Sequence, residues 1–137
     1  MRHEQVQAEW RRAQRSLRAA EALRAQEFLE DAISRAYYAV MYAARAALLL
    51  HDVVAKRHAA VRRLFGQVLI KTGELEKEWA GILAHEQDQR VGADYNVDFE
   101  VSAESADELL RDARRFVERI ARYLASKGLT LGQDDQA

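Results

Sequence analysis

The strongest constraint on the fold of this chain is the stretch SRAYYAVMYAARAALLL at residues 34–50, which would be apolar on almost every side of a helix. A helix with such a surface must be buried on most sides. Its polar side chains follow a spacing of four, three, four and three residues, which places them on one face. They are Asp31, Arg35, Tyr38, Tyr42 and Arg45. An arginine in apolar surroundings is costly unless it is paired, so we expect an internal acid or a bound anion beside it.

The rest of the chain also favours helix, because it has no proline and only 6 glycines in 137 residues. Apolar spacing predicts helices over roughly 3–26, 29–51, 58–71 and 74–92, and a last helix from Ser102, its N-cap, to Gly128. Short connections favour packing side by side. We therefore predict an all-α fold, an antiparallel bundle of four to five helices. Residues 1–128 form one domain, and residues 129–137 are expected to be a polar, disordered tail.

The composition argues against several classes of protein. The net charge of −1 disfavours nucleic-acid binding by bulk charge, and the absence of cysteine excludes disulfides and thiol metal sites. No histidines and acids have metal-ligand spacing, so we predict no metal and no cofactor. No signal peptide is visible, and the longest apolar run is shorter than the roughly 20 residues that span a bilayer. We expect a soluble cytoplasmic protein that does not bind membranes.

A second group of polar residues ends the fourth predicted helix. The apolar stripe of that helix consists of Leu75, Trp79, Ile82 and Leu83. At helical spacing the stripe continues to Glu86 and Arg90, just before Gly92, and Asp94 and Tyr95 follow at once. These groups could hold a phosphate, with the planar guanidinium of Arg90 as a two-pronged donor. In the alternative, Arg90 pairs with Glu86 or Asp94 and closes the end of the bundle.

The histidines and the outer arginines have simpler interpretations. His58, at the start of the third predicted helix, either caps that helix or meets Arg90 across the bundle. His85 lies off the apolar stripe and is expected at the surface. Arginines on the first and last helices alternate with acids, which indicates solvated faces with salt bridges. Trp10, Phe65, Trp79 and Phe116 lie on apolar stripes and are expected in the core.

Several of these residues carry a family resemblance. The segment SRAYYA at 34–39, His58, the pair Phe65-Gly66 and the segment RVGADY at 90–95 resemble the HEPN superfamily, in particular its small stand-alone bacterial and archaeal branch. The resemblance covers roughly residues 17–124. It implies a helical bundle that forms a homodimer. It also implies a gene beside that of a minimal nucleotidyltransferase, in a toxin–antitoxin-like pair. Many members are metal-independent ribonucleases.

The chain departs from the pattern of the active ribonucleases, which use an arginine followed four to six residues later by a histidine. Arg90 matches the arginine, but Asp94 and Tyr95 occupy the positions where the histidine would lie. Tyr42 also stands where relatives often have histidine. A tyrosine titrates near pH 10 and an aspartate is a weak base, so neither replaces a histidine at neutral pH. The departure weighs against ribonuclease activity, but it leaves the phosphate-binding role of Arg90 intact.

The resemblance gives Tyr95 a further role. In paired systems of this superfamily, the nucleotidyltransferase modifies a tyrosine close to the arginine motif and thereby silences the toxin. Tyr95 follows Arg90 by five residues, at the end of the fourth predicted helix. The alternative is that Tyr95 only packs over the end of the bundle.

Three functions therefore remain open: a ribonuclease toxin, a purely structural dimeric bundle, and a non-catalytic HEPN-like module. We favour the third, a module that binds nucleotide or RNA and acts with a nucleotidyltransferase partner. The arginines expected in apolar settings weigh against a purely structural role. We also predict a homodimer, because the second helix has more apolar surface than one seam needs. The candidate catalytic residues are Arg90, Asp94 and Tyr95, and the candidate ligand-binding residues are Arg35, Tyr38, Tyr42, Arg45 and His58.

Overall fold

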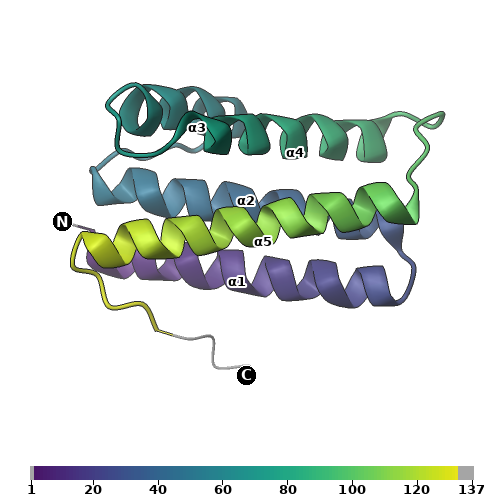
Figure 1. Ribbon diagram of the computed structural model, residues 1–137, viewed down its shortest axis with the longest axis horizontal. Coiled ribbons are helices and arrows are strands. Elements are labelled where there is room, and N and C mark those ends of the chain that lie inside the picture. The colour runs from purple at the N-terminus through teal and green to yellow at the C-terminus, as the bar shows by residue number, and fades with distance from the viewer. Residues whose placement is uncertain (1, 133–137) are drawn as a thin grey trace.

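The computed structural model describes residues 2–132, and this part of the chain is helical without any strand (Figure 1). The elements are α1 (His3–Ala25), α2 (Leu29–Leu50), α3 (His58–Phe65), the π-helical turn η1 (Gly66–Ile70), α4 (Lys77–Tyr95) and α5 (Ala103–Ser126). The predicted all-α bundle is confirmed.

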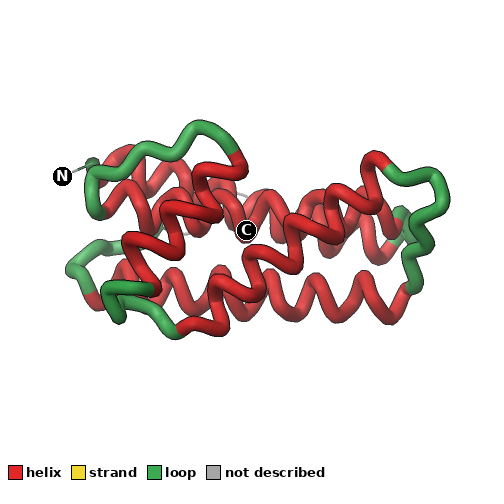
Figure 2. Tube along the Cα trace, turned by 90° about the horizontal axis from the view of Figure 1, so that it is seen from above, coloured by secondary structure: helices red, strands yellow, loops and turns green. Residues whose placement is uncertain are grey.

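The helix α2 forms the centre of the molecule. In Figure 1 it lies between α1 and α4 with α5 in front, and it contacts α1, α3, α4 and α5. Helix α4 crosses the bundle obliquely (Figure 2). This central position explains why residues 34–50 are apolar on nearly every side. It also removes our argument for a dimer, because the apolar surface of α2 is buried within one chain.

The ends of the helices follow the predicted signals. Ser102 caps α5 in a capping box, in which the N–H of Ser105 donates to Ser102 Oγ (3.0 Å) and the N–H of Ser102 donates to Ser105 Oγ (3.2 Å). Gly73 and Gly128 both have left-handed φ angles, +80° and +88°, which glycine adopts without a steric penalty. These caps stop the chain from continuing each helix past the bundle.

Two predicted boundaries in the middle of the chain were wrong. The third helix does not run unbroken to residue 71, because it widens into η1 at Gly66. Helix α4 begins at Lys77 rather than at Glu74 or Leu75. The N–H of Leu75 donates instead to the carbonyl of Leu69, which closes a turn before the helix.

The predicted end of α4 near Gly92 was also wrong, since the helix continues to Tyr95. Gly92 has a packing role instead of a stopping role. A Cβ atom at this position would lie 2.4 Å from Cε2 of Phe99, so the ring of Phe99, in the loop at residues 96–102, would have to shift for any larger residue. The extra turn places Asp94 on the helix, one turn after Arg90.

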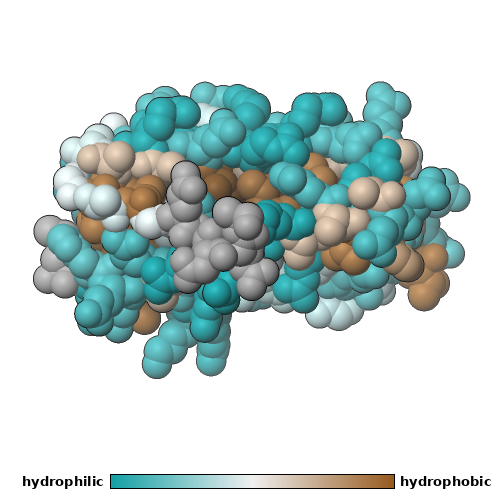
Figure 3. All heavy atoms as spheres, turned by 90° about the horizontal axis from the view of Figure 1, so that it is seen from below, coloured by the Kyte–Doolittle hydropathy of each residue, from teal (hydrophilic) through white to brown (hydrophobic). Residues whose placement is uncertain are grey.

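The surface is mostly polar, with apolar side chains at one end and in a band along the face that Figure 3 shows. Figure 3 shows hydrophobic side chains protruding at the end where the α1–α2 turn and the α4–α5 loop lie. Phe28 and Val97, in these two connections, are 52% and 99% exposed. Among the described residues, no helix is both long and apolar enough to cross a membrane.

The packed part of the chain extends slightly past the predicted domain end at residue 128. Leu129 is buried, and the side-chain amide of Gln7 donates to the carbonyl of Thr130 (2.6 Å). The remainder of the predicted tail, residues 133–137, lies outside the described residues.

Candidate functional site

Arg90 projects from α4 onto the aromatic side chains of α2. Its Nη2 donates to the hydroxyl oxygen of Tyr38 (3.2 Å). Its guanidinium carbon lies 5.7, 5.5 and 5.6 Å from the ring centroids of Tyr37, Tyr38 and Tyr95. The side chain is only 15% exposed. Each cation–π contact of this kind contributes on the order of 0.5–2 kcal/mol, so the rings hold the guanidinium in one place.

Asp94 is the acid that pairs with Arg90. Its Oδ2 lies 2.9 Å from Arg90 Nε, although the N–H of that nitrogen is not aimed along a hydrogen bond. Glu86, the other candidate, has no hydrogen-bond partner for either carboxyl oxygen among residues 2–132. Asp94 remains 29% exposed, so it neutralises Arg90 from the solvent side. The internal pair that we weighed as an alternative to a bound anion is therefore present.

His58 lies beside the same two tyrosine rings as Arg90. Its ring centroid lies 5.5 Å from that of Tyr37 and 5.7 Å from that of Tyr38. Burial, and then the positive charges of Arg90 and Arg45, lower the pKa of His58 below its usual value of 6.5. The imidazole is therefore neutral at neutral pH and able to accept a proton. The alternative role as a helix cap was wrong, because α3 has Arg57 at its N-cap and no side-chain cap bond.

Tyr37 forms the buried wall of this group. It is 1% exposed, and burial raises its pKa to about 12, so its hydroxyl stays neutral. Tyr37 was not among the candidate residues, so its place beside Arg90 was missed. Consecutive residues of a helix point about 100° apart, so the spacing that selected Tyr38 did not select Tyr37.

The other candidate residues lie along α2. Arg35 is exposed, which corrects our expectation of a buried arginine, and its guanidinium carbon lies 5.4 Å from the ring centroid of Tyr38. The ring of Tyr42 lies 6.1 Å from that of Tyr38. Arg45 turns toward α1, where its Nη2 lies 3.3 Å from Glu9 Oε1. Glu9 was expected among the acids of the solvated face of the first helix, but the structure buries it.

Tyr95 is the last residue of α4 and the most accessible of the aromatic residues around Arg90. It is 72% exposed, although its ring lies over the guanidinium of Arg90. Its hydroxyl is therefore available to solvent.

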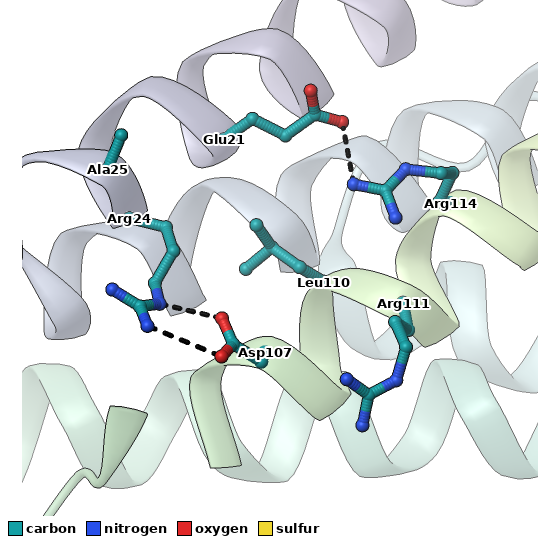
Figure 4. Close-up of a pocket in the computed structure, with 7 residues that line it drawn as sticks. All are labelled: Glu21, Arg24, Ala25, Asp107, Leu110, Arg111 and Arg114. Atoms are coloured by element: carbon teal, nitrogen blue, oxygen red, sulfur yellow. Dashed lines mark hydrogen bonds and ion pairs between the residues drawn. The ribbon is translucent and has the colours of Figure 1, made fainter. Parts of the chain in front are cut away.

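The arginines of α1 and α5 form salt bridges, as predicted. Figure 4 shows a hollow between these helices, lined by Glu21, Arg24, Ala25, Asp107, Leu110, Arg111 and Arg114. Arg24 donates to both carboxyl oxygens of Asp107 (2.6 and 3.3 Å), and Arg114 donates to Glu21 (3.1 Å). Because two of the three arginines are paired with acids, this hollow is a weaker anion site than the surroundings of Arg90.

Comparison with known proteins identifies the family. The profile of the HEPN domain matches residues 6–123, which contain the whole group around Arg90. The chain belongs to the HEPN domain family. Metal ligands are not gathered in this HEPN domain, since no three His, Cys, Asp or Glu side chains within residues 2–132 lie close enough to hold an ion.

Several relatives align over most of the HEPN domain. "Putative toxin MJ0142" of Methanocaldococcus jannaschii is 35% identical over 124 residues, which is 90% of this chain and 84% of the relative. "Putative toxin MJ0605" of the same organism is 34% identical over 88% of this chain and 90% of the relative. A UPF0332 protein of Gloeobacter violaceus is 34% identical over 83% of this chain and 91% of the relative.

Proposed function

We propose that this HEPN domain is a toxin-like module that binds a phosphate group of RNA or of a nucleotide at Arg90. The observation that carries the proposal is the position of this arginine, which is held by tyrosine rings beside a neutral histidine. A bundle stabilised only by packing gains little from such an arrangement. The names of the two archaeal relatives support the toxin class.

A phosphate would bind by replacing Asp94. Both are anions, and Asp94 lies on the exposed side of Arg90 at 2.9 Å. The guanidinium can donate in parallel to two phosphate oxygens, and such charge-assisted bonds are about twice as strong as neutral ones. Arg35 lies over the same Tyr38 ring and offers a second positive charge.

The test is the titration of the protein with adenosine 5′-monophosphate and with inorganic phosphate in a calorimeter. Arg90→Ala should weaken binding by about 10- to 100-fold, the usual cost of hydrogen bonds to a charged group. Arg114→Ala is the matched control, because it removes an arginine of α5 that is salt-bridged to Glu21 of α1. If wild type and Arg90→Ala bind equally, or if neither binds these probes nor RNA, the proposal is wrong.

A ribonuclease is the second candidate function, and the position of His58 favours it. In this reaction neutral His58 takes the proton of a ribose 2′-hydroxyl, and the resulting oxygen attacks phosphorus. The bond from phosphorus to O5′ breaks, and the leaving oxygen takes a proton from water. Arg90 stabilises the negative charge that develops on the phosphoryl oxygens. His58 of α3 would thus take the role of the histidine that is absent after Arg90.

This reaction is tested by the products of RNA cleavage. We expect ends with a 2′,3′-cyclic phosphate, loss of cleavage in His58→Gln, and no cleavage of a strand with deoxyribose at the scissile position. His85→Gln is the control, because His85 is exposed. Binding of RNA without cleavage by the wild type would exclude the ribonuclease and leave the binding module.

We further propose that the module acts in the cytoplasm with a minimal nucleotidyltransferase, which modifies Tyr95. The exposed hydroxyl of Tyr95 is accessible to the active site of a partner. A nucleotide on this hydroxyl would bring negative charge beside Arg90 and compete with RNA. After co-expression with a nucleotidyltransferase encoded beside this gene, the intact mass should rise by whole nucleotide units. A mass that does not rise, or rises equally in Tyr95→Phe, would contradict this role.

The homodimer also remains a proposal, now on a different surface. Val91 is an exposed hydrophobic residue near the end of α4, and Val97 is exposed in the next loop. Such side chains are commonly covered by a partner. Light scattering should give twice the mass of the chain, and Val97→Asp should lower it to one chain mass. A monomeric wild type would contradict the dimer.

A further inference from the structure

The buried helix α2 has one open stripe. From residue 34 onward all its side chains are buried except Ser34, Arg35, Tyr38, Tyr42 and Arg45. This stripe faces outward between α1, which supplies Arg12 and Glu9, and α4, which supplies Arg90. A helix that is otherwise buried thus presents tyrosines and arginines in a single row.

The two tyrosines of the stripe form a short aromatic surface. The ring centroids of Tyr38 and Tyr42 are 6.1 Å apart, and the ring planes differ by 30°. Both side chains are half-buried, so their positions are held by the bundle while part of each ring remains accessible. Preorganised rings of this kind can stack with a base at little cost in side-chain entropy.

Arginines lie at both ends of this aromatic surface. Arg12 lies over Tyr42, with its guanidinium carbon 5.7 Å from the ring centroid. Arg35 and Arg90 lie over Tyr38 at 5.4 and 5.5 Å. From Arg35 to Tyr42 the helix rises about 10 Å, which suits a segment of a few nucleotides.

The acids of the site favour a single strand over a duplex. Glu9 lies 3.8 Å from Arg12, Asp94 pairs with Arg90, and the whole chain carries a charge of −1. Attraction of phosphates alone is therefore weak, whereas stacking on a ring needs an unpaired base. The rings of Tyr38 and Tyr42, with arginines at both ends, therefore suit a single strand of nucleic acid whose bases face the protein.

We propose that the open stripe of α2 is a stacking subsite for single-stranded RNA. Bases stack on Tyr38 and Tyr42 in place of the guanidinium groups of Arg35 and Arg12, which move to contact the phosphates beyond the one held by Arg90. This proposal rests on the proposed function at Arg90. It adds that the ligand is single-stranded and that the strand runs from Arg90 along α2 toward α1.

The test uses fluorescence anisotropy with a labelled oligoadenylate RNA and two matched probes. One probe is the same strand with abasic positions, and the other is the strand annealed to its complement. Wild type should bind the intact single strand more tightly than either matched probe. Tyr42→Leu should weaken binding of the intact strand by about 5- to 100-fold, the range expected for loss of one stacked base, and should leave the abasic strand unaffected.

Further variants separate stacking from other roles of these residues. Tyr42→Phe keeps the ring and should bind like wild type. Arg12→Gln should reduce the slope of the logarithm of the binding constant against the logarithm of salt concentration by the amount expected for about one phosphate contact. Arg11→Gln, which changes the neighbouring arginine outside the stripe, should leave this slope unchanged. Thermal unfolding of each variant shows whether the fold is retained.

Each outcome points to one conclusion. If RNA binding needs Arg90 but wild type does not distinguish the intact from the abasic strand, the stacking subsite is wrong and the proposed function stands. The comparison of these two strands needs no variant, so it holds even if Tyr42→Leu fails to fold. If the duplex binds as well as the single strand, the proposal is also overturned. If Arg90→Ala does not alter binding, the proposed function itself fails.

Discussion

Glu86 is expected to lower the stability of this protein at neutral pH. It is 1% exposed on α4, and neither of its carboxyl oxygens has a hydrogen-bond partner among the described residues. Burial, and then the nearby charge of Asp112, raise its pKa well above the usual value of 4.5. The folded protein therefore holds a proton that the unfolded chain releases as the pH rises above 4.5.

The sign and size of the effect follow from proton linkage. Because the folded state binds more protons, the free energy of unfolding falls as the pH rises from the unfolded pKa toward the folded pKa. The loss is about 1.4 kcal/mol for each pH unit in which the carboxyl stays protonated in the folded state only. Glu86→Gln has nearly the same shape without this titration. The free energy of unfolding of Glu86→Gln should therefore exceed that of the wild type by an amount that grows by about 1.4 kcal/mol per pH unit above pH 4.5. The difference should become constant once the carboxyl group of Glu86 ionises in the folded protein.

Urea unfolding of both proteins across a series of pH values measures this difference. Glu108→Gln serves as the control, because Glu108 is an exposed acid on α5. The control should show no comparable growth with pH. A difference between Glu86→Gln and wild type that is independent of pH, or a variant that is less stable at neutral pH, would mean that Glu86 is ionised and paired. The reasoning from burial would then be refuted.

Three further predictions concern the site and its support. In Arg90→Ala the pKa of His58, measured by NMR titration, should rise toward 6.5, because the charge of Arg90 lowers it in the wild type. An unchanged pKa would show that Arg90 does not influence the titration of His58. Asp94→Asn should tighten binding of adenosine 5′-monophosphate by about 3- to 10-fold, since it removes the competing anion, and calorimetry that shows equal or weaker binding would contradict the displacement. Gly92→Ala should destabilise the fold by about 1–3 kcal/mol in urea unfolding, because its methyl group would displace Phe99; wild-type stability would show that this ring moves freely.

The amino-acid sequence determines the secondary structure and the burial of this protein to a large extent. The row of apolar residues at 34–50 requires a central helix, and the structure places α2 there. The signals at Ser102 and Gly128 locate the ends of α5 correctly, because capping depends on neighbouring residues. The family follows from the sequence as well, since it depends on motifs that are local in the chain.

Tertiary structure decides what each polar residue contacts. Spacing places Arg35 and Arg45 on one face of α2, but only the packing of α1 provides Glu9 for Arg45 and leaves Arg35 exposed. Gly92 reads as a helix stop in the sequence, and only the return of the loop shows that it accommodates Phe99. Helical periodicity describes one helix at a time, whereas partners come from helices far apart in the chain.

The candidate site shows the same division. The sequence determines that Arg90, Asp94 and Tyr95 are close to one another, because they lie within one short segment of the chain. The meeting of Arg90 with Tyr38 and His58 depends on three helices and the oblique crossing of α4 over α2. The lowered pKa of His58 is likewise a product of that packing, because it arises from burial and from arginines on two other helices.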